Sequence, residues 1–317
     1  MKTTSALFSI LLLLICTVAK AQNDDGINDV KTDSIKMDNI FRSYTYYVPK
    51  DIKKSSKLIF ILHGSTMKSS LMITATGYQF NRHANTSKDE IIVYPQGFET
   101  YWNDCRKSAT YSANLLNLNE AGFFKAVIAK FYTDYGIDTS QVFVTGFSNG
   151  GHMVYKLAME NPALFKGFAA ISASLPVESN NDCVSKNQPV SILIANGTTD
   201  SISPFNGGTV LAGDGKNRGD VAPTFNSVQY FKDLMKCGEI IETKKGLPDT
   251  DKEDSSTVNV YDYRCKNQGK RIELIEIVNG GHIFPNPTFD QWPKSLGNVN
   301  KDVNLPELIL NFFNSLE

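Results

Sequence analysis

Ser148 stands in a pattern that favours nucleophilic chemistry. The segment Gly146-Phe-Ser-Asn-Gly150 has the form G-x-S-x-G and follows a β-branched and aromatic run that begins at Gln141. In a sharp turn from strand to helix the serine backbone is strained, and side chains two positions before or after it would collide with the strand or the helix. Glycine at both positions avoids these collisions. The pattern therefore predicts a nucleophilic serine on a tight turn, rather than a chance Gly/Ser pattern in a flexible loop.

A serine hydroxyl becomes a strong nucleophile only when a base accepts its proton and a third group orients that base. In strand–turn–helix sites of this kind the chain order is serine, acid, histidine. Of the 4 histidines, two precede the serine, and His152 leaves no room for an intervening acid. His282 remains, in a glycine-containing loop directly after the apolar run 272–278. We predict that His282 is the base.

Asp200 has the best position among the carboxylates between Ser148 and His282. It follows the apolar run 190–195 through the short loop 196–199. It therefore stands at the carboxyl end of a predicted strand, where it can hold one tautomer of His282 and stabilise the imidazolium. Most of the other carboxylates lie in polar loops or on helix surfaces. The sequence thus predicts Asp200 as the third member, with a simple turn carboxylate as the alternative.

Acyl transfer also needs hydrogen-bond donors for the developing oxyanion, each worth about 3 to 4 kcal/mol. One donor should be the backbone N–H of Asn149, directly after the nucleophile. The other should come from the loop after an early strand, His63-Gly-Ser65, as the N–H of Ser65 or Gly64. His63 itself is expected to form a wall of the site or to lie behind it. It has no partners at a spacing suited to a metal, so no metal site is expected.

Apolar runs and helical spacing place these residues in a chain whose strands alternate with helices. This alternation implies parallel crossovers and a sheet with helices on both faces. Ligands bind at the carboxyl ends of such strands, where each predicted catalytic residue falls. Strands are predicted at 41–48, 57–62, 90–94, 141–147, 168–172, 190–195, 258–263 and 272–278, and helices at 80–84, 119–135, 149–160, 225–236 and 306–313.

Two stretches interrupt the alternation. Residues 207–224 are rich in Gly and Asp and begin close to Asp200, so they are expected to shape the site. Residues 244–256 are rich in charge and are predicted to be a solvated excursion.

The length of the chain fits one large α/β domain. The 317 residues are 41% hydrophobic and 21% charged, which is ordinary for a globular protein with a large core. The formal net charge is −1, and the isoelectric point is near 6.4. Nothing in this balance predicts a nucleic-acid or anionic-membrane partner.

The N-terminus has the features of a secretory signal peptide. Met1-Lys2 is followed by the apolar run 6–18 and by Ala19-Lys-Ala21, which predicts cleavage after Ala21. The run is shorter than the roughly 20 residues that span a membrane. Cys16 raises lipid attachment as an alternative, which the bulky Ile15 disfavours. We therefore predict a secreted or periplasmic protein with a signal peptide at 1–21, a flexible leader at 22–37 and a catalytic domain at 38–317.

Removal of that peptide leaves an even number of cysteines in a chain bound for an oxidising space, namely Cys105, Cys183, Cys237 and Cys265. This context favours disulfides over free thiols, and no C-x-x-C spacing suggests zinc. Three pairings are possible. We favour Cys105 with Cys183 and Cys237 with Cys265. The second bond would join a helix end to a strand end and contribute about 3 kcal/mol.

Several motifs together resemble a known family. They occur in the order seen in secreted α/β-hydrolases of the polyhydroxybutyrate depolymerase and feruloyl/acetyl-xylan esterase group, of the carbohydrate esterase family 1 type. The resemblance covers roughly residues 40–317. It implies an α/β-hydrolase fold in a single domain, a Ser148, Asp200, His282 triad and ester hydrolysis without a cofactor. The motifs are Leu62-His-Gly-Ser65, Tyr94-Pro-Gln-Gly97, Trp102-Asn-Asp104, Gly146-Phe-Ser-Asn-Gly-Gly151, Asn196-Gly-Thr-Thr-Asp200 with Pro204, and Gly280-Gly-His-Ile-Phe-Pro285.

The chain departs from this family at positions near the predicted site. Asn196 stands where members often have His, Phe205 where Tyr is usual, and Phe284 where Trp is usual. These departures leave the catalytic machinery intact and bear on the substrate. The predicted aromatic walls for an acyl group are Trp102, Phe147, Phe205, Phe284 and Trp292.

The leading hypothesis is an esterase that releases acids from plant-polysaccharide side chains. The expected substrates are feruloylated or acetylated polysaccharide fragments, with feruloyl esters ahead of acetyl esters. A short-chain polyester depolymerase is the enzyme alternative, because it uses the same machinery. A non-catalytic binding protein on the same fold is a hypothesis from another class.

Overall fold

The computed structural model describes residues 26–37, 39–211, 215–266 and 269–316. Its central sheet has ten strands in the order β1-β2-β4-β3-β5-β6-β7-β12-β11-β10, and β8 pairs with β9 in a separate hairpin. The strands are β1 Lys31–Met37, β2 Ile40–Tyr47, β3 Lys57–Leu62, β4 Glu90–Pro95, β5 Val142–Phe147, β6 Gly167–Ile171, β7 Ile192–Gly197, β8 Gly208–Leu211, β9 Asn217–Val221, β10 Ile240–Gly246, β11 Thr257–Cys265 and β12 Arg271–Val278.

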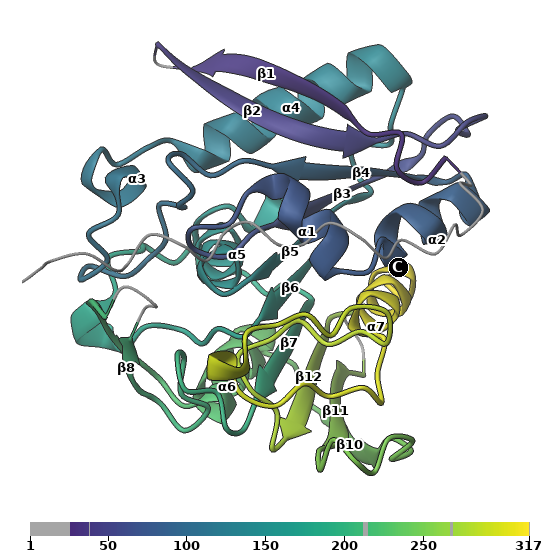
Figure 1. The fold of residues 1–317 in the computed structure, drawn as a ribbon. Helices are drawn as coiled ribbons and strands as arrows, with labels where there is room; N and C mark the ends of the chain where they lie inside the picture. The colour runs from purple at the N-terminus through teal and green to yellow at the C-terminus, as the bar shows by residue number, and fades with distance from the viewer. Residues whose placement is uncertain (1–25, 38, 212–214, 267–268, 317) are drawn as a thin grey trace, which may run out of the picture.

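The middle of the sheet, from β4 through β3, β5, β6 and β7 to β12, is parallel. The strands at its two edges, β1 and β2 on one side and β11 and β10 on the other, pair antiparallel (Figure 1). The predicted mostly parallel sheet is confirmed. Because these strands are covered on both faces, they are nearly continuous apolar runs, as in β3.

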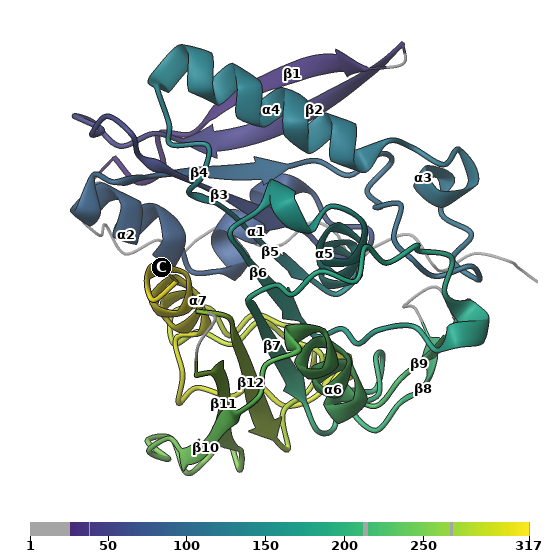
Figure 2. The same ribbon diagram turned by 180° about the vertical axis from the view of Figure 1, so that it is seen from behind.

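Helices cover both faces of the sheet, as predicted. Helices α1, α2 and α7 lie on one face, and α4, α5 and α6 on the other (Figures 1 and 2). The helices are α1 Ser69–Ala75, α2 Gln79–Ser87, α3 Ser112–Leu115, α4 Glu120–Tyr135, α5 Asn149–Glu160, α6 Thr224–Met235 and α7 Leu305–Asn314, with 3₁₀ turns at Pro162–Leu164, Glu178–Asn180 and Lys294–Leu296.

Alternate side chains of one strand enter two separate cores. Leu58 and Phe60 of β3 belong to the core under α4, α5 and α6. Ile59 and Ile61 belong to the core on the opposite face, under α1, α2 and α7. This alternation follows from the two-residue period of a strand. The sheet is thereby held rigid from both faces, which fixes the strand ends that carry the site.

The flexible leader predicted at 22–37 is wrong for its second half. Residues 31–37 form β1, which pairs with β2 along its whole length. Ile35 and Met37 pack against the core, so an every-second-residue apolar pattern was present in this polar stretch. The signal peptide, its cleavage after Ala21 and Cys16 lie outside the described residues.

The two interruptions contain more structure than the sequence predicts. Within 207–224, β8 and β9 form a hairpin. The charged stretch 244–256 overlaps β10, whose backbone pairs with β11 from Ile240 to Gly246. The side chains of an edge strand can be exposed and charged, because pairing with its one neighbour is enough to form the strand. The exposed, charged residues of β10 therefore gave no apolar pattern that predicts a strand.

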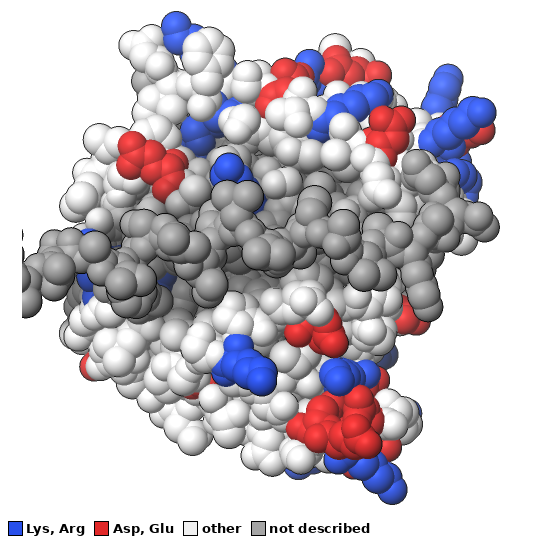
Figure 3. Space-filling model, in the orientation of Figure 1, with Lys and Arg blue, Asp and Glu red and all other residues white. Residues whose placement is uncertain are grey.

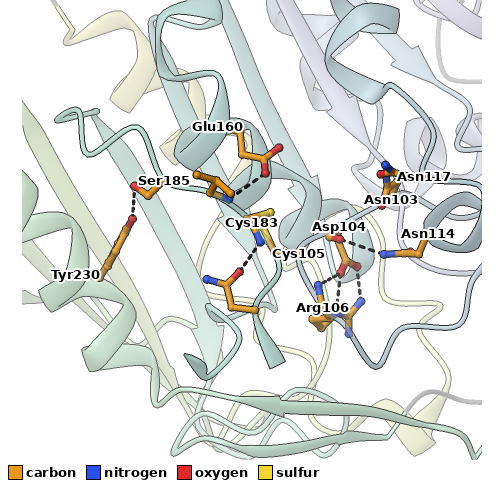
Figure 4. The surroundings of a disulfide bond; sticks show 12 residues. Asn103, Asp104, Cys105, Arg106, Asn114, Asn117, Glu160, Cys183, Ser185 and Tyr230 are labelled. Atoms are coloured by element: carbon orange, nitrogen blue, oxygen red, sulfur yellow. Dashed lines mark hydrogen bonds and ion pairs between the residues drawn. A yellow bond between two sulfur atoms is a disulfide. The ribbon is translucent and has the colours of Figure 1, made fainter. Parts of the chain in front are cut away.

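Two disulfides join the described cysteines in the favoured pairing, Cys105 with Cys183 and Cys237 with Cys265. Cys237 follows the last turn of α6 and Cys265 ends β11, so the second bond does join a helix end to a strand end. The first bond lies beside Asp104 and Arg106 (Figure 4).

Charged side chains are scattered among larger uncharged areas on the face shown in Figure 3. Among the described residues, no helix has both the length and the apolar character required to cross a membrane.

Candidate active site

Ser148 occupies the sharp turn between β5 and α5, with φ 55° and ψ −118°. A Cβ on Gly146 would lie 2.3 Å from the carbonyl oxygen of Gly150, and a Cβ on Gly150 would lie 2.7 Å from the carbonyl oxygens of Leu62 and His63. Backbone atoms cannot yield to such contacts. The steric demand for glycine at both positions, predicted from the sequence, is therefore present in the structure.

Ser148, Asp200 and His282 come together at the carboxyl ends of β5, β7 and β12. The Nε2 atom of His282 lies 2.9 Å from the Ser148 hydroxyl oxygen, and its Nδ1 lies 2.7 Å from Oδ2 of Asp200. The backbone N–H groups of Ile202 and Ser203 donate to Oδ1 of Asp200, each over 2.8 Å. This geometry allows the ring to accept the serine proton while the carboxylate orients it.

The loops that carry Asp200 and His282 are tied to each other. The hydroxyl and the backbone N–H of Thr199 both donate to the carbonyl of Gly280. A Cβ on Gly197 would lie 2.2 Å from that same oxygen, so only glycine allows the two loops to approach. The His282 N–H donates to the carbonyl of Leu296, which holds the histidine loop from its other side.

The predicted oxyanion donors adjoin Ser148. Asn149 is the first residue of α5, where N–H groups point out of the helix and favour negative charge. A Cβ on Gly64 would lie 3.3 Å from Cβ of Ser148, so the loop after β3 borders the serine directly. Within the described part of the chain, neither the Ser65 N–H nor the Asn149 N–H has an acceptor.

The prediction that His63 forms a wall of the site is wrong, because its side chain is fully buried. Its Nε2 accepts the N–H of Gly97 over 2.9 Å, and its Nδ1 lies 2.7 Å from the Gly64 carbonyl. Burial lowers the pKa of His63 to about 4. The neutral ring therefore joins the loops after β3 and β4 and lies behind the site, which was the other expectation.

Trp102 is likewise buried, so the prediction that it forms a wall for the substrate is wrong. Its ring stacks on Phe124, and its indole N–H donates to the His63 carbonyl over 2.9 Å. Its backbone N–H donates to Oδ1 of Asn149 over 2.8 Å. Trp102 thus supports the loops of the site from beneath.

The other predicted aromatic walls divide into two groups. Phe147 adjoins the site, because its ring centroid lies 5.1 Å from that of His282 and 5.2 Å from that of the partly exposed Trp292. Its own side chain is buried, so Trp292 is the partly exposed ring of this pair. Phe284 is fully buried behind Phe147, so its predicted wall position is wrong. Phe205 is also buried and packs edge-on against Phe225 of α6.

Asn196 is buried and does not face a substrate. The expectation that Asn in place of the family's His at this position affects the choice of substrate is therefore not supported by its contacts. The residue is 2% exposed, and its amide nitrogen donates to the Ala173 carbonyl and to the Thr224 hydroxyl, each over 2.9 Å. Its amide oxygen accepts the N–H of Ala173. These bonds join β7 to the segment after β6 and to α6.

Tyr111 is a residue at the site that sequence reasoning missed. Its hydroxyl lies 3.1 Å from the Ser65 hydroxyl, and its ring stacks on Tyr101 with centroids 4.3 Å apart. The Arg218 guanidinium lies 4.3 Å from the centre of the same ring. No periodicity marks the irregular loop before α3, so the sequence carried no signal for Tyr111.

Two cavities among the described residues lie away from the triad. One of about 560 Å³ borders α4 and α5 and includes Asn103, Lys156 and Glu160, and one of about 310 Å³ borders β10 and α7. Neither is lined by Ser148 or His282. Among the described residues, no group of three or more His, Cys, Asp or Glu side chains is arranged to hold a metal ion.

Comparisons with known proteins give the family and the fold of the chain. The sequence profile of a family described as phospholipase/carboxylesterase matches residues 46–213, just over half of the chain. Feruloyl esterase C of Emericella nidulans is 28% identical over 187 residues, which are 58% of this chain and 64% of that protein. A protein of Nocardia uniformis subsp. tsuyamanensis that carries the name of an esterase, NocK, is 26% identical over 199 residues, or 61% of this chain and 56% of that protein.

The chain therefore spans less than two thirds of the length of either relative. Among solved structures, the acetyl xylan esterase of Aspergillus awamori matches 90% of this chain and 99% of its own, with a TM-score of 0.54 and 14% identity. At that identity the match concerns the fold alone, and the fold is that of an α/β-hydrolase.

Proposed function

The chain belongs to the phospholipase/carboxylesterase family, and on that premise we propose that it is a serine esterase that hydrolyses carboxylic esters through an acyl-enzyme on Ser148. The observation that carries the proposal is the chain of contacts from Ser148 Oγ to His282 Nε2, at 2.9 Å, and from His282 Nδ1 to Asp200, at 2.7 Å. Ester hydrolysis by this mechanism requires no cofactor in addition to these side chains and the backbone donors.

The reaction follows from these positions. Ser148 Oγ attacks the acyl carbon while its proton passes to Nε2 of His282, and Asp200 stabilises the imidazolium. The N–H groups of Asn149 and Ser65, with Gly64 as the alternative donor, bind the oxyanion of the tetrahedral intermediate. The imidazolium then protonates the departing alcohol. A water molecule, deprotonated by His282, attacks the acyl-enzyme and releases the acid.

The proposed substrates are esters of plant cell-wall polysaccharide, with feruloyl esters ahead of acetyl esters. Several relatives carry the name feruloyl esterase, among them feruloyl esterase D of Neurospora crassa. Trp292, which is partly exposed and packs against Phe147, the ring beside His282, supplies flat apolar surface for an aromatic acyl group. A hydroxybutyrate polyester remains the alternative substrate, because the same machinery would cut it.

The proposed location is extracellular or periplasmic, after cleavage at Ala21, with one catalytic domain. The two disulfides support it, since such bonds persist in oxidising compartments. Because β1 belongs to the central sheet, we place the start of the domain before Lys31 rather than at residue 38.

The proposal is tested by hydrolysis of p-nitrophenyl acetate by the wild type and by Ser148→Ala. We expect the variant to lose at least about 1,000-fold in kcat, because the nucleophile is gone. Equal turnover by both proteins would contradict the role of Ser148 as nucleophile. No turnover by the folded wild type would leave a non-catalytic binding protein as the better description. A panel of methyl ferulate, acetylated xylan and a hydroxybutyrate oligomer then ranks the substrates, and fastest release of hydroxybutyrate would overturn the feruloyl assignment.

A further inference from the structure

The loop between β4 and α3 contacts both sides of the oxyanion region. One residue of it, Trp102, donates its backbone N–H to Oδ1 of Asn149 over 2.8 Å and its indole N–H to the His63 carbonyl over 2.9 Å. Asn149 begins α5, and His63 immediately precedes Gly64 and Ser65. The two segments that present the N–H donors are thus linked through a single buried residue, by its backbone on one side and its side chain on the other.

Asp104 holds the α5 side more firmly. Its Oδ2 accepts from the Asn149 amide nitrogen over 2.6 Å, and the Arg106 guanidinium donates to both carboxylate oxygens, at 3.0 and 2.5 Å. Burial alone would raise the pKa of Asp104, but the charge and hydrogen bonds of Arg106 hold it below its ordinary value. The carboxylate is therefore ionised, and it fixes which way the Asn149 amide points.

The end of the same loop holds the opposite side. The Tyr111 hydroxyl lies 3.1 Å from the Ser65 hydroxyl. Just before the loop begins, the Thr100 carbonyl accepts the Thr66 N–H over 3.1 Å. Tyr111 is buried, and its ring is held by stacking on Tyr101. Ser65 is thus positioned by a side chain that the loop itself keeps in place.

A disulfide anchors this loop at its centre. Cys105, between Asp104 and Arg106, is bonded to Cys183 (Figure 4). The backbone also pairs there, because the Asp182 N–H donates to the Cys105 carbonyl. The loop is therefore fixed to a third segment, independent of the two that carry the N–H donors.

We propose that residues 101–111, here called the brace loop, set the distance between the N–H groups of Asn149 and Ser65, so that Trp102, Asp104 and Tyr111 are positioning residues for ester hydrolysis. The inference rests on the proposed function. Oxyanion donors act only when they lie about 2.7 to 3.1 Å from the developing charge. A misplacement of about 1 Å costs on the order of 100-fold in rate. The Ser148 nucleophile and the Asp200–His282 pair stand outside the brace loop and keep their own contacts.

The test uses two variants that leave every backbone donor in place. Tyr111→Phe removes only the hydroxyl beside Ser65, and Asn149→Ala removes the amide that Asp104 and Trp102 hold. We expect kcat to fall by about 10-fold and about 100-fold respectively, with KM within about twofold of the wild type. The inhibition constant of an aryl trifluoromethyl ketone, which forms a tetrahedral adduct with the nucleophile, should rise in parallel.

Matched controls come from a buried pair on α2 and β4. Tyr94 donates its hydroxyl to the Asn81 amide oxygen over 2.8 Å, and both side chains are fully buried. Tyr94→Phe and Asn81→Ala make the same chemical changes away from the brace loop. Thermal unfolding confirms that each variant is folded, and we expect both controls to keep kcat within about twofold.

Unchanged kcat in folded Tyr111→Phe and Asn149→Ala would contradict the positioning role of the brace loop and leave the proposed function intact. So would a loss confined to KM, or an equal loss in the controls. A folded wild type that hydrolyses no ester contradicts the proposed function itself and, with it, the role of the brace loop. Turnover that Ser148→Ala abolishes and that both brace variants reduce supports both inferences.

Discussion

The role of a single residue at this site depends on its burial as much as on its chemistry. Ser148 and His282 carry the proposed reaction, while His63 and Asn196 hold loops together from fully or almost fully buried positions. Such residues resemble catalytic ones in a sequence, because polar side chains beside strand ends serve both purposes. Their contacts separate the two roles, since a buried ring whose nitrogens already have partners has nothing left for a substrate.

At this scale, His63 should make stability depend on pH. Burial lowers its pKa from 6.5 to about 4 in the folded protein. Between these values the unfolded chain binds a proton that the folded chain does not, so the free energy of unfolding should rise as pH rises from 4 to 6.5. The gain is about 3 kcal/mol.

Urea unfolding at pH 4.5 and pH 7 measures this dependence. The buried His152 shifts in the same direction, so the contribution of His63 is isolated by comparison with His63→Gln. The variant should show a smaller difference between the two pH values. An identical difference in both proteins would contradict the assigned cause.

Elements are joined by a few buried polar contacts in addition to their apolar faces. Arg42 of β2 and Glu120, the first residue of α4, form an ion pair at 2.7 Å in which both side chains are buried. The Arg42 guanidinium lies 4.5 Å from the centre of the Phe123 ring, and Glu120 accepts the Asn103 N–H. The pair thus joins the antiparallel strand β2 to the beginning of α4.

Loss of one partner should therefore be costly. Glu120→Gln leaves the charge of Arg42 buried without a carboxylate, and we expect it to lower the free energy of unfolding by about 3 to 5 kcal/mol. The control is Glu239→Gln, which breaks the exposed pair with Lys266 and should cost less than about 1 kcal/mol. Denaturant titration of both variants decides, and equal small losses would show that the buried pair is not a stabilising link.

The whole molecule is also held by its two disulfides, which close loops of very different length. The sequence separation is 78 residues for Cys105–Cys183 and 28 residues for Cys237–Cys265. The long loop contains Ser148 and the central strands β5 and β6, while the short one ties α6 to the antiparallel edge. In the chain-entropy view a longer closed loop restricts the unfolded chain more and so stabilises the fold more.

Removal of the Cys105–Cys183 bond should therefore lower stability more than removal of the Cys237–Cys265 bond. The chain-entropy relation gives about 4.5 kcal/mol for Cys105–Cys183 and about 3.6 kcal/mol for Cys237–Cys265. We therefore expect the Cys105→Ser/Cys183→Ser protein to unfold at lower temperature than Cys237→Ser/Cys265→Ser. Calorimetry of both double variants measures this order, and the reverse order would show that local contacts outweigh chain entropy here.

By itself the sequence determined the alternation of strands and helices, the glycine-flanked Ser148 and the order that selects Asp200 and His282. These are local properties, because apolar period, turn geometry and position after a strand can each be seen within about a dozen residues. The sequence did not predict the edge strands β1 and β10, because pairing with a neighbour, rather than their own apolar content, makes them strands.

Only the tertiary structure decided which polar and aromatic residues reach the site. His63, Trp102 and Phe284 became buried supports, while Tyr111, from a loop without any period, came to lie beside Ser65. Burial and contact between residues distant in the chain depend on how all the elements pack together. No local pattern contains that information, and so the supports of the proposed oxyanion hole emerged only from the folded chain.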